Sequence, residues 1–176
     1  PIVREALIAN LVQDKVLHFI TGQDSDSWYR SSSSLGKSAL KIKIPTGRAV
    51  EPAGATALMA QIPEVEAVVL VHAEASTSIM NPVRELSPIF RQNGRQLLIV
   101  DATYSALTTE LSFDRDHIDA MVIGSVAFGL PPGFCLVVLS YKAFDQMEQV
   151  EKKGHAFDFS RLASHMGPSW EDGGPH

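Results

Sequence analysis

The stretch VEAVVLVHAEASTSIMNPVRELSPIFRQNGRQLLIVDATYS, residues 65–105, holds the pattern that decides the fold. Residues 65–71 and 96–100 are short runs that are apolar apart from Glu66 and Gln96, which is typical of strands buried on both faces. Between them, Pro82 opens a segment with helical spacing, and Asn93-Gly94 ends it after residue 92. Two buried strands separated by a helix predict neighbouring strands of a parallel sheet.

The same alternation continues in both directions along the chain. Further strands are expected at residues 15–21, 38–44, 120–123 and 134–139, and helices at residues 2–12, 26–35, 52–61 and 141–152. Apolar strands that alternate with helices indicate a mostly parallel sheet with helices on both faces. The predicted fold is therefore α/β, a three-layer sandwich. No apolar run approaches the roughly 20 residues that span a bilayer, so a membrane is not an expected partner.

Composition restricts the class of protein. The chain has 176 residues and a net charge of −5, so it lacks the cationic surface that binding to a phosphate backbone needs. Nucleic acid is therefore not an expected partner. A single cysteine, Cys135, excludes a disulfide within the chain and a metal site built from cysteines alone. Residues 1–5 do not resemble a secretory leader, so the expected compartment is the cytoplasm.

Polar residues follow the predicted strands at the carboxyl ends, where open parallel sheets bind ligands. Asp101 comes directly after the run 97–100, and a buried carboxylate there needs a cationic or hydrogen-bonding partner. Two interpretations of Asp101 stay open: a partner for a protonated ring nitrogen or a metal, and a cap of a helix or turn. His72 and Glu74 also end a strand, and their spacing predicts side chains on one face. Together with Asp101, these two side chains could form the metal site of a hydrolase, which is a third alternative. The simpler interpretation is that His72 is a hydrogen-bonded residue in the wall of the cleft.

Signatures of other enzyme classes are absent from the sequence. No G-x-S-x-G nucleophile elbow occurs, and Ser125 lies instead in G-S-V-A-F. Neither a Walker A motif nor a G-x-G-x-x-G loop is present. The chain is therefore not expected to be a serine hydrolase of the elbow type or a nucleotide-binding protein of these two types.

Three blocks of the sequence resemble the large domain of class-V, fold-type I aminotransferases, which depend on pyridoxal phosphate. They read VVLVHAEASTSIMNPVREL at 68–86, LLIVDATYSAL at 97–107 and IDAMVIGSVAFGLPPGFCLVVLS at 118–140. The resemblance points to the phosphoserine and alanine–glyoxylate (serine–pyruvate) branch. It implies an incomplete large domain at residues 1–154 and a stub of the C-terminal region at 155–176. The end of this stub, from His165 onward, is rich in Gly, Pro and polar residues and is expected to be a loose tail.

The resemblance also implies a set of cofactor-binding residues. Asp101 matches the aspartate that pairs with the pyridine nitrogen and keeps it protonated, which lets the ring accept electrons. Thr103 and Ser125 stand at neighbouring strand ends. Ala75 takes the position at which the family carries a Thr or Ser near the phenolic oxygen of the cofactor. The implied cofactor is pyridoxal phosphate, and no metal ligand is implied.

The third block departs from the family pattern at its catalytic residue. Family members read much like S-V-Q-K-x-F-G-L-P-x-G, and their Lys forms the Schiff base and moves the proton. Here residues 125–128 read S-V-A-F, so the Gln-Lys pair is missing between intact flanks. Gln23 or Asp24 also replaces the aromatic that stacks on the ring in the family. Covalent attachment of the cofactor is therefore not expected, and no catalytic residue is assigned.

Two functions follow from this resemblance. The first is an aminotransferase-like domain, related to amino-group transfer between a small amino acid (phosphoserine, serine or alanine) and a 2-oxo acid, and inactive as written because the Schiff-base Lys is absent. The alternative is a pseudoenzyme, a non-catalytic dimerisation or interaction module that pairs with itself or with a full-length relative. Reduction with borohydride distinguishes the two functions, because it would fix the cofactor to a lysine of an enzyme but not to a non-catalytic module.

Overall fold

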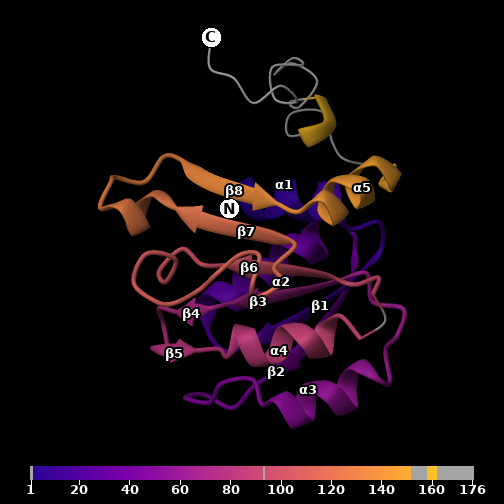
Figure 1. Cartoon of the computed structure of the whole chain (residues 1–176), viewed down its shortest axis with the longest axis horizontal. Helices are drawn as coiled ribbons and strands as arrows, with labels where there is room; N and C mark the ends of the chain where they lie inside the picture. Colours follow the sequence, from indigo (N-terminus) through magenta and orange to yellow (C-terminus); the bar gives the residue numbers. More distant parts are fainter. Residues whose placement is uncertain (1, 93, 152–157, 162–176) are drawn as a thin grey trace.

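The computed structural model of the chain describes residues 2–92, 94–151 and 158–161 (Figure 1). The helices are α1 (Ile2–Leu11), α2 (Gln23–Ser34), α3 (Pro52–Met59), α4 (Val83–Phe90), the short 3-10 helix η1 (Ser125–Phe128) and α5 (Tyr141–Gln149). The strands are β1 (Lys15–Ile20), β2 (Ser38–Lys43), β3 (Ala67–Val71), β4 (Ala73–Glu74), β5 (Ile79–Met80), β6 (Leu97–Asp101), β7 (Ala120–Gly124) and β8 (Cys135–Leu139).

Six of these strands form one sheet in the order β2-β1-β3-β6-β7-β8. All neighbours run parallel except β7 and β8, which are antiparallel. Each predicted helix and strand is present with ends shifted by a few residues, whereas the β4–β5 hairpin and η1 were not predicted. Within the described ranges, no helix is long and apolar enough to cross a membrane. The expected loose tail lies outside the described residues.

Helices cover both faces of the sheet, and each layer has its own apolar core (Figure 1). Leu97 and Ile99 of β6 pack in the core shared with α1, α2 and α5. Leu98 and Val100 pack in the core shared with α3 and α4. The predicted three-layer sandwich is confirmed. Because side chains alternate along a strand, Asp101 belongs to the face of Leu97 and Ile99, which α1 and α2 cover.

Helix α2 begins at Gln23, earlier than the predicted start at Asp26. The carboxylate of Glu74 accepts hydrogen bonds from the backbone N–H groups of Asp24 at 2.6 Å and of Ser25 at 3.1 Å. It thereby satisfies orphan donors of the first turn, and its negative charge suits the positive end of the helix dipole. This cap comes from β4, far away in the sequence, so local sequence signals place the helix start too late.

The loop after β1 and the β4–β5 hairpin meet at Gly22. A Cβ atom at Gly22 would stand 2.3 Å from Cγ of Glu74 and 2.4 Å from Oγ of Ser76. The hydroxyl of Thr77 donates a hydrogen bond to the carbonyl oxygen of Thr21 at 3.0 Å. The two loops therefore pack so closely that this position has no room for a side chain.

His18 lies in the middle of β1 and is 1% exposed. Its Nε2 is 2.9 Å from Oγ of Ser32, while Nδ1 has no hydrogen-bond partner among the described residues. Burial lowers the pKa of His18 from 6.5 to about 3. The imidazole is therefore neutral in the folded protein, because a buried charge without a counter-ion is strongly unfavourable.

We predict that His18 makes the stability of the protein fall with acidification. Below pH 6.5, His18 is protonated in the unfolded chain, whereas in the folded chain it stays neutral until about pH 3. The free energy of unfolding therefore decreases as the pH falls from 6.5 to about 3. Relative to His18→Leu, the wild type should lose about 1.4 kcal/mol of unfolding free energy per pH unit, measured by urea denaturation between about pH 6 and about pH 4. Parallel curves for the two proteins contradict the prediction.

We predict that Gly22→Ala destabilises the fold by about 2 kcal/mol, because the new methyl group overlaps Glu74 and Ser76. The matched control is Gly54→Ala in α3, where a Cβ meets nothing within 4 Å. This control should gain about 0.5–1 kcal/mol, since alanine is the better helix former. Thermal and urea unfolding of the three proteins measure both changes, and equal stability of Gly22→Ala and the wild type refutes the close packing.

Candidate functional site

The carboxyl ends of β3, β6 and β7 lie at one edge of the sheet, because these strands are parallel neighbours. Asp101 ends β6, Thr103 follows it in the next turn, and Ser125 begins η1 directly after β7. The turn after β6 lies close to the end of β7 at Gly124, where a Cβ atom would stand 2.7 Å from Cγ2 of Thr103. Three residues that the sequence assigns to the cofactor are thus brought to one edge.

A cavity of about 880 Å³ opens at this edge of the sheet. Thr103 and Ser125 line it together with apolar side chains that include Ile2, Val126 and Phe134. Its volume falls within the range of small-molecule sites, roughly 300–1,000 Å³. The combination of two hydroxyl groups and an apolar wall makes it the candidate site.

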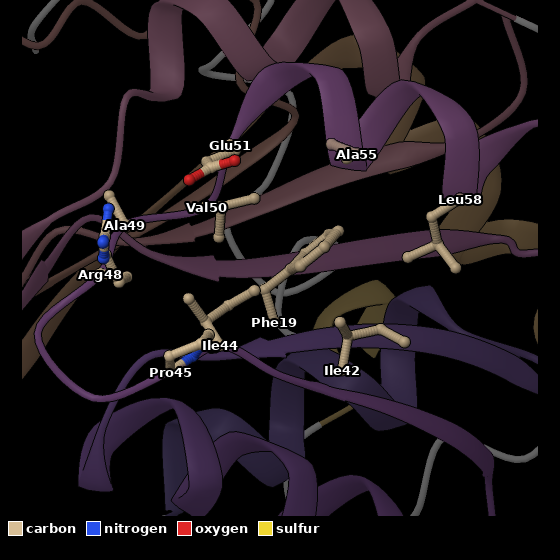
Figure 2. Close-up of a pocket in the computed structure, with 11 residues that line it drawn as sticks. Phe19, Ile42, Ile44, Pro45, Arg48, Ala49, Val50, Glu51, Ala55 and Leu58 are labelled. Carbon is tan, nitrogen blue, oxygen red and sulfur yellow. The ribbon is translucent and has the colours of Figure 1, made fainter.

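A second cavity, of about 670 Å³, lies between β1–β2 and α3. Figure 2 shows Phe19, Ile42 and Leu58 in its wall, and Arg48 and Glu51 are its charged lining residues. None of the site residues assigned from the sequence lines this cavity. It is therefore separate from the candidate site at the strand ends.

The carboxylate of Asp101 is held on both oxygens, and the side chain is 6% exposed. The indole Nε1–H of Trp28 donates to Oδ2 at 2.7 Å, and the backbone N–H of Thr103 donates to Oδ1 at 3.0 Å. Nη2 of Arg4 lies 3.8 Å from Oδ2. Asp101 therefore caps the turn that follows β6, as one of the two interpretations left open by the sequence has it, and it also faces the Arg4 guanidinium. Its role as a partner for a ring nitrogen or a metal stays a prediction.

Arg4 joins Asp101 to a second carboxylate, that of Asp24. Nη2 of Arg4 is 3.4 Å from Oδ1 of Asp24, and its guanidinium carbon is 5.9 Å from the ring centroid of Trp28. Burial and the nearby charge of Glu74 raise the pKa of Asp24; Arg4 opposes this rise, and Asp101 adds to it. The guanidinium thus neutralises repulsion between carboxylates that would otherwise face one another.

Ala75 lies in the turn of the β4–β5 hairpin. Its backbone N–H forms a hydrogen bond to Asp24, which links this turn to the Arg4 and Asp101 group. The methyl side chain has no hydrogen-bonding group. Ala75 is therefore connected to the site through its backbone alone.

His72 and Glu74 do not form the pair that the sequence predicts. Nδ1 of His72 is 2.8 Å from Oγ of Ser105, whereas the Glu74 carboxylate binds the start of α2. The chain turns into the β4–β5 hairpin after β3, so the alternation of a continuous strand does not extend to Glu74. Within the described ranges, no group of three or more His, Cys, Asp or Glu side chains could hold a metal ion. The simpler interpretation of His72, a hydrogen-bonded wall residue, fits these contacts.

Two residues of this site, Arg4 and Trp28, are not predicted from the sequence. Both lie on helices, α1 and α2, rather than at a strand end. Because a buried carboxylate requires hydrogen-bond donors or a cation, the sequence does predict that Asp101 has partners. Which residues these partners are depends on how α1 and α2 pack on the sheet. No local pattern marks either residue.

Pyridoxal phosphate, the cofactor implied by the resemblance, needs a lysine for covalent attachment. Residues 124–133 contain none. The described lysines lie at the start of β1, before and along β2, and in α5: Lys15, Lys37, Lys41, Lys43 and Lys142. Nζ of Lys142 donates to the carbonyl oxygen of Gln96, which precedes β6, so Lys142 lies at the opposite end of β6 from Asp101. With Asp101 already held by Trp28 and Arg4, the described residues do not form a complete site for this cofactor.

The chain matches known aminotransferases over most of its length. The family model of class-V aminotransferases matches residues 13–172. An uncharacterized aminotransferase of Methanocaldococcus jannaschii is 28% identical over 149 residues, which cover 83% of this chain and 38% of that protein. A 2-aminoethylphosphonate–pyruvate transaminase of Burkholderia ambifaria is 37% identical over 106 residues, 58% of this chain and 28% of that protein. The chain thus spans well under half the length of these relatives.

Solved structures share the fold. An alanine–glyoxylate aminotransferase from Nostoc sp. superposes with a TM-score of 0.85 at 24% identity, over 94% of this chain and 45% of that one. A phosphoserine aminotransferase from Cytophaga hutchinsonii gives a TM-score of 0.80 at 23% identity, over 92% and 45% of the two chains. The mostly parallel sheet, its flanking helices and the family match over residues 13–172 lead to one assignment. This chain belongs to the class-V aminotransferase family.

Proposed function

We propose that this chain is a class-V aminotransferase domain that does not carry out amino transfer by itself. The family depends on pyridoxal phosphate, and amino transfer needs an amine that binds the cofactor and moves a proton. The supporting observation is the turn after β7, where η1 carries Val126 and Ala127 and no lysine beside the candidate site. Asp101 supplies the carboxylate for a ring nitrogen, but nothing in residues 124–133 supplies the amine.

The proposal extends to substrate class, partner and location. Asp101, Thr103, Ser125 and the backbone at Ala75 are the residues that we assign to the cofactor side of the site. By family, the related substrates are a small amino acid and a 2-oxo acid. We also propose a division into a large domain at residues 1–154 and a C-terminal stub at 155–176, and a cytoplasmic location.

We predict that the purified 176-residue chain neither transfers amino groups nor traps the cofactor at one lysine. The chain is incubated with stoichiometric pyridoxal phosphate, reduced with borohydride, and analysed by intact mass and peptide mapping. The expected result is little adduct, spread over several lysines, and no transfer from alanine, serine or phosphoserine to a 2-oxo acid. One adduct per chain on a single lysine, together with amino transfer, overturns the proposal.

The control for this experiment is Lys142→Arg. Burial lowers the pKa of Lys142, so its amine is more easily deprotonated and is the natural competitor for the aldehyde. If the wild type shows one dominant adduct and Lys142→Arg lacks it, the reaction is at the far end of β6 and is unrelated to the candidate site. Absence of amino transfer in both proteins then leaves the proposal standing.

A non-catalytic interaction module is the second candidate, and a specific surface favours it. Three apolar side chains around the cavity are about half exposed: Val126 at 52%, Leu130 at 46% and Phe134 at 51%. We call these three residues the strand-end apolar patch. Exposed apolar patches of this kind favour association with another protein surface. Under this candidate, the chain pairs with itself or with a full-length relative through the patch.

We predict that Phe134→Glu shifts the chain toward the monomer, because a charge in the centre of an apolar contact must be desolvated. Analytical ultracentrifugation measures the oligomeric state of the wild type, of Phe134→Glu and of Tyr141→Glu. Tyr141 is 92% exposed and follows β8 at its far end, so its variant is the control and should match the wild type. A wild type that is monomeric at all tested concentrations rules out self-association through the patch.

A further inference from the structure

The charged side chains around Asp101 include more carboxylates than cations. Three carboxylates, those of Asp24, Glu74 and Asp101, lie here, and burial together with the charges of Glu74 and Asp101 raises the pKa of Asp24. Glu74 is committed to the first turn of α2, where it accepts from backbone N–H groups and from the Ser25 hydroxyl. The guanidinium of Arg4 is the cation that pairs with both of the others, at 3.4 Å from Asp24 and 3.8 Å from Asp101.

The position of Arg4 is set by two packing contacts. It lies in the first turn of α1, and its helix neighbours Ile2, Val3 and Ala6 line the cavity at the strand ends. The guanidinium also lies near the indole ring of Trp28, with 5.9 Å from its central carbon to the ring centroid. Its side chain is only 20% exposed. Arg4 is therefore a partly desolvated cation fixed between the cavity wall and the Asp101 carboxylate.

We propose that Arg4 is a built-in counter-ion of Asp101, which takes the place of a protonated pyridine nitrogen and keeps ligands of that chemistry from the Asp101 carboxylate. Both oxygens of Asp101 already have partners, Trp28 and Arg4 at Oδ2 and the backbone N–H of Thr103 at Oδ1, so a pyridinium N–H competes with them for this carboxylate. To bind at Oδ2, it must displace the guanidinium and the indole N–H, which breaks the ion pairs of Arg4 and leaves the buried Trp28 donor without its acceptor. The loss of these contacts in a partly desolvated site disfavours binding.

This inference rests on the proposed role of Asp101 as the partner of a ring nitrogen. It is independent of the absent lysine, because it concerns binding without a covalent bond. A suitable probe is pyridoxamine 5′-phosphate, which has the same ring nitrogen as pyridoxal phosphate but no aldehyde. It therefore cannot form adducts with surface lysines and reports the non-covalent site alone.

The test measures binding of pyridoxamine 5′-phosphate by isothermal titration calorimetry to the wild type, Arg4→Gln, Arg30→Gln and the double variant Arg4→Gln/Asp101→Asn. Arg4→Gln should bind at least about tenfold more tightly than the wild type, which corresponds to about 1.4 kcal/mol. Arg30→Gln is the control, since Arg30 is also an arginine paired with a carboxylate, but its partner is Asp26 and its side chain is largely exposed. It should bind like the wild type.

Each outcome has one meaning. Equal or weaker binding by Arg4→Gln, including no detectable binding by either protein, overturns the role of Arg4. If Arg4→Gln gains affinity and the double variant loses the gain, both the counter-ion and the role of Asp101 stand. If the double variant keeps the gain, Arg4 opposes binding but Asp101 is not the partner of the ring nitrogen, and that part of the proposed function fails.

A second readout needs no ligand. NMR titration of the Asp24 carboxyl carbon should show a higher pKa in Arg4→Gln than in the wild type, because the charge that opposes the rise is removed. Near-ultraviolet circular dichroism of Trp28 checks that the variant is folded. If Arg4→Gln does not fold, Arg4→Lys replaces it, and the smaller, more mobile cation should give a smaller gain in affinity of the same sign. An unchanged Asp24 pKa together with unchanged affinity refutes the inference.

Discussion

The hydrogen bond from the Trp28 indole to the Asp101 carboxylate is the interaction on which the functional edge of the molecule depends. Both groups are nearly inaccessible, with Trp28 at 0% and Asp101 at 5% exposure. A buried polar group without a partner costs about 1–3 kcal/mol. The hydrogen bond avoids this cost for both the indole N–H of Trp28 and the carboxylate of Asp101. Trp28 is also part of the apolar core between α2 and the sheet. One side chain therefore packs the helical layer onto the sheet and orients the carboxylate at the end of β6.

Long-range polar contacts also fix the loops around that carboxylate. Asn81 is fully buried, and its side chain donates to the Thr21 hydroxyl at 3.1 Å and to the Val71 carbonyl at 2.8 Å. Its Oδ1 accepts from the backbone N–H of Val50 at 3.0 Å. Together with the cap that Glu74 provides for α2, this residue ties the β3 end to the loops after β1 and β2. Side-chain hydrogen bonds between distant residues therefore connect the loops at the strand ends.

The site combines features of an aminotransferase with features that work against one. The parallel sheet brings Asp101, Thr103 and Ser125 to one edge, where Thr103 and Ser125 line the cavity and Asp101 is buried behind it. The turn that carries the attaching amine in the family pattern carries Val126 and Ala127 here. The Asp101 carboxylate, which we propose as the partner of a ring nitrogen, pairs with Arg4 of the same chain. A buried carboxylate needs a counter-ion or hydrogen-bond donors whether or not a ligand is bound, and Arg4, Trp28 and the backbone N–H of Thr103 supply them here.

The sequence alone determined the α/β class, the parallel sheet and the place of Asp101, because continuous apolar runs and their spacing report burial directly. The sequence also shows that residues 124–133 contain no lysine, and folding cannot change this. The true start of α2, the separation of His72 from Glu74 and the partners of Asp101 were decided by tertiary structure. In each case the deciding contact joins residues that are distant in the chain, as Asp24 and Glu74 or Trp28 and Asp101 are. Local patterns record what a residue needs, whereas only the packing of α1 and α2 on the sheet determines which residue provides it.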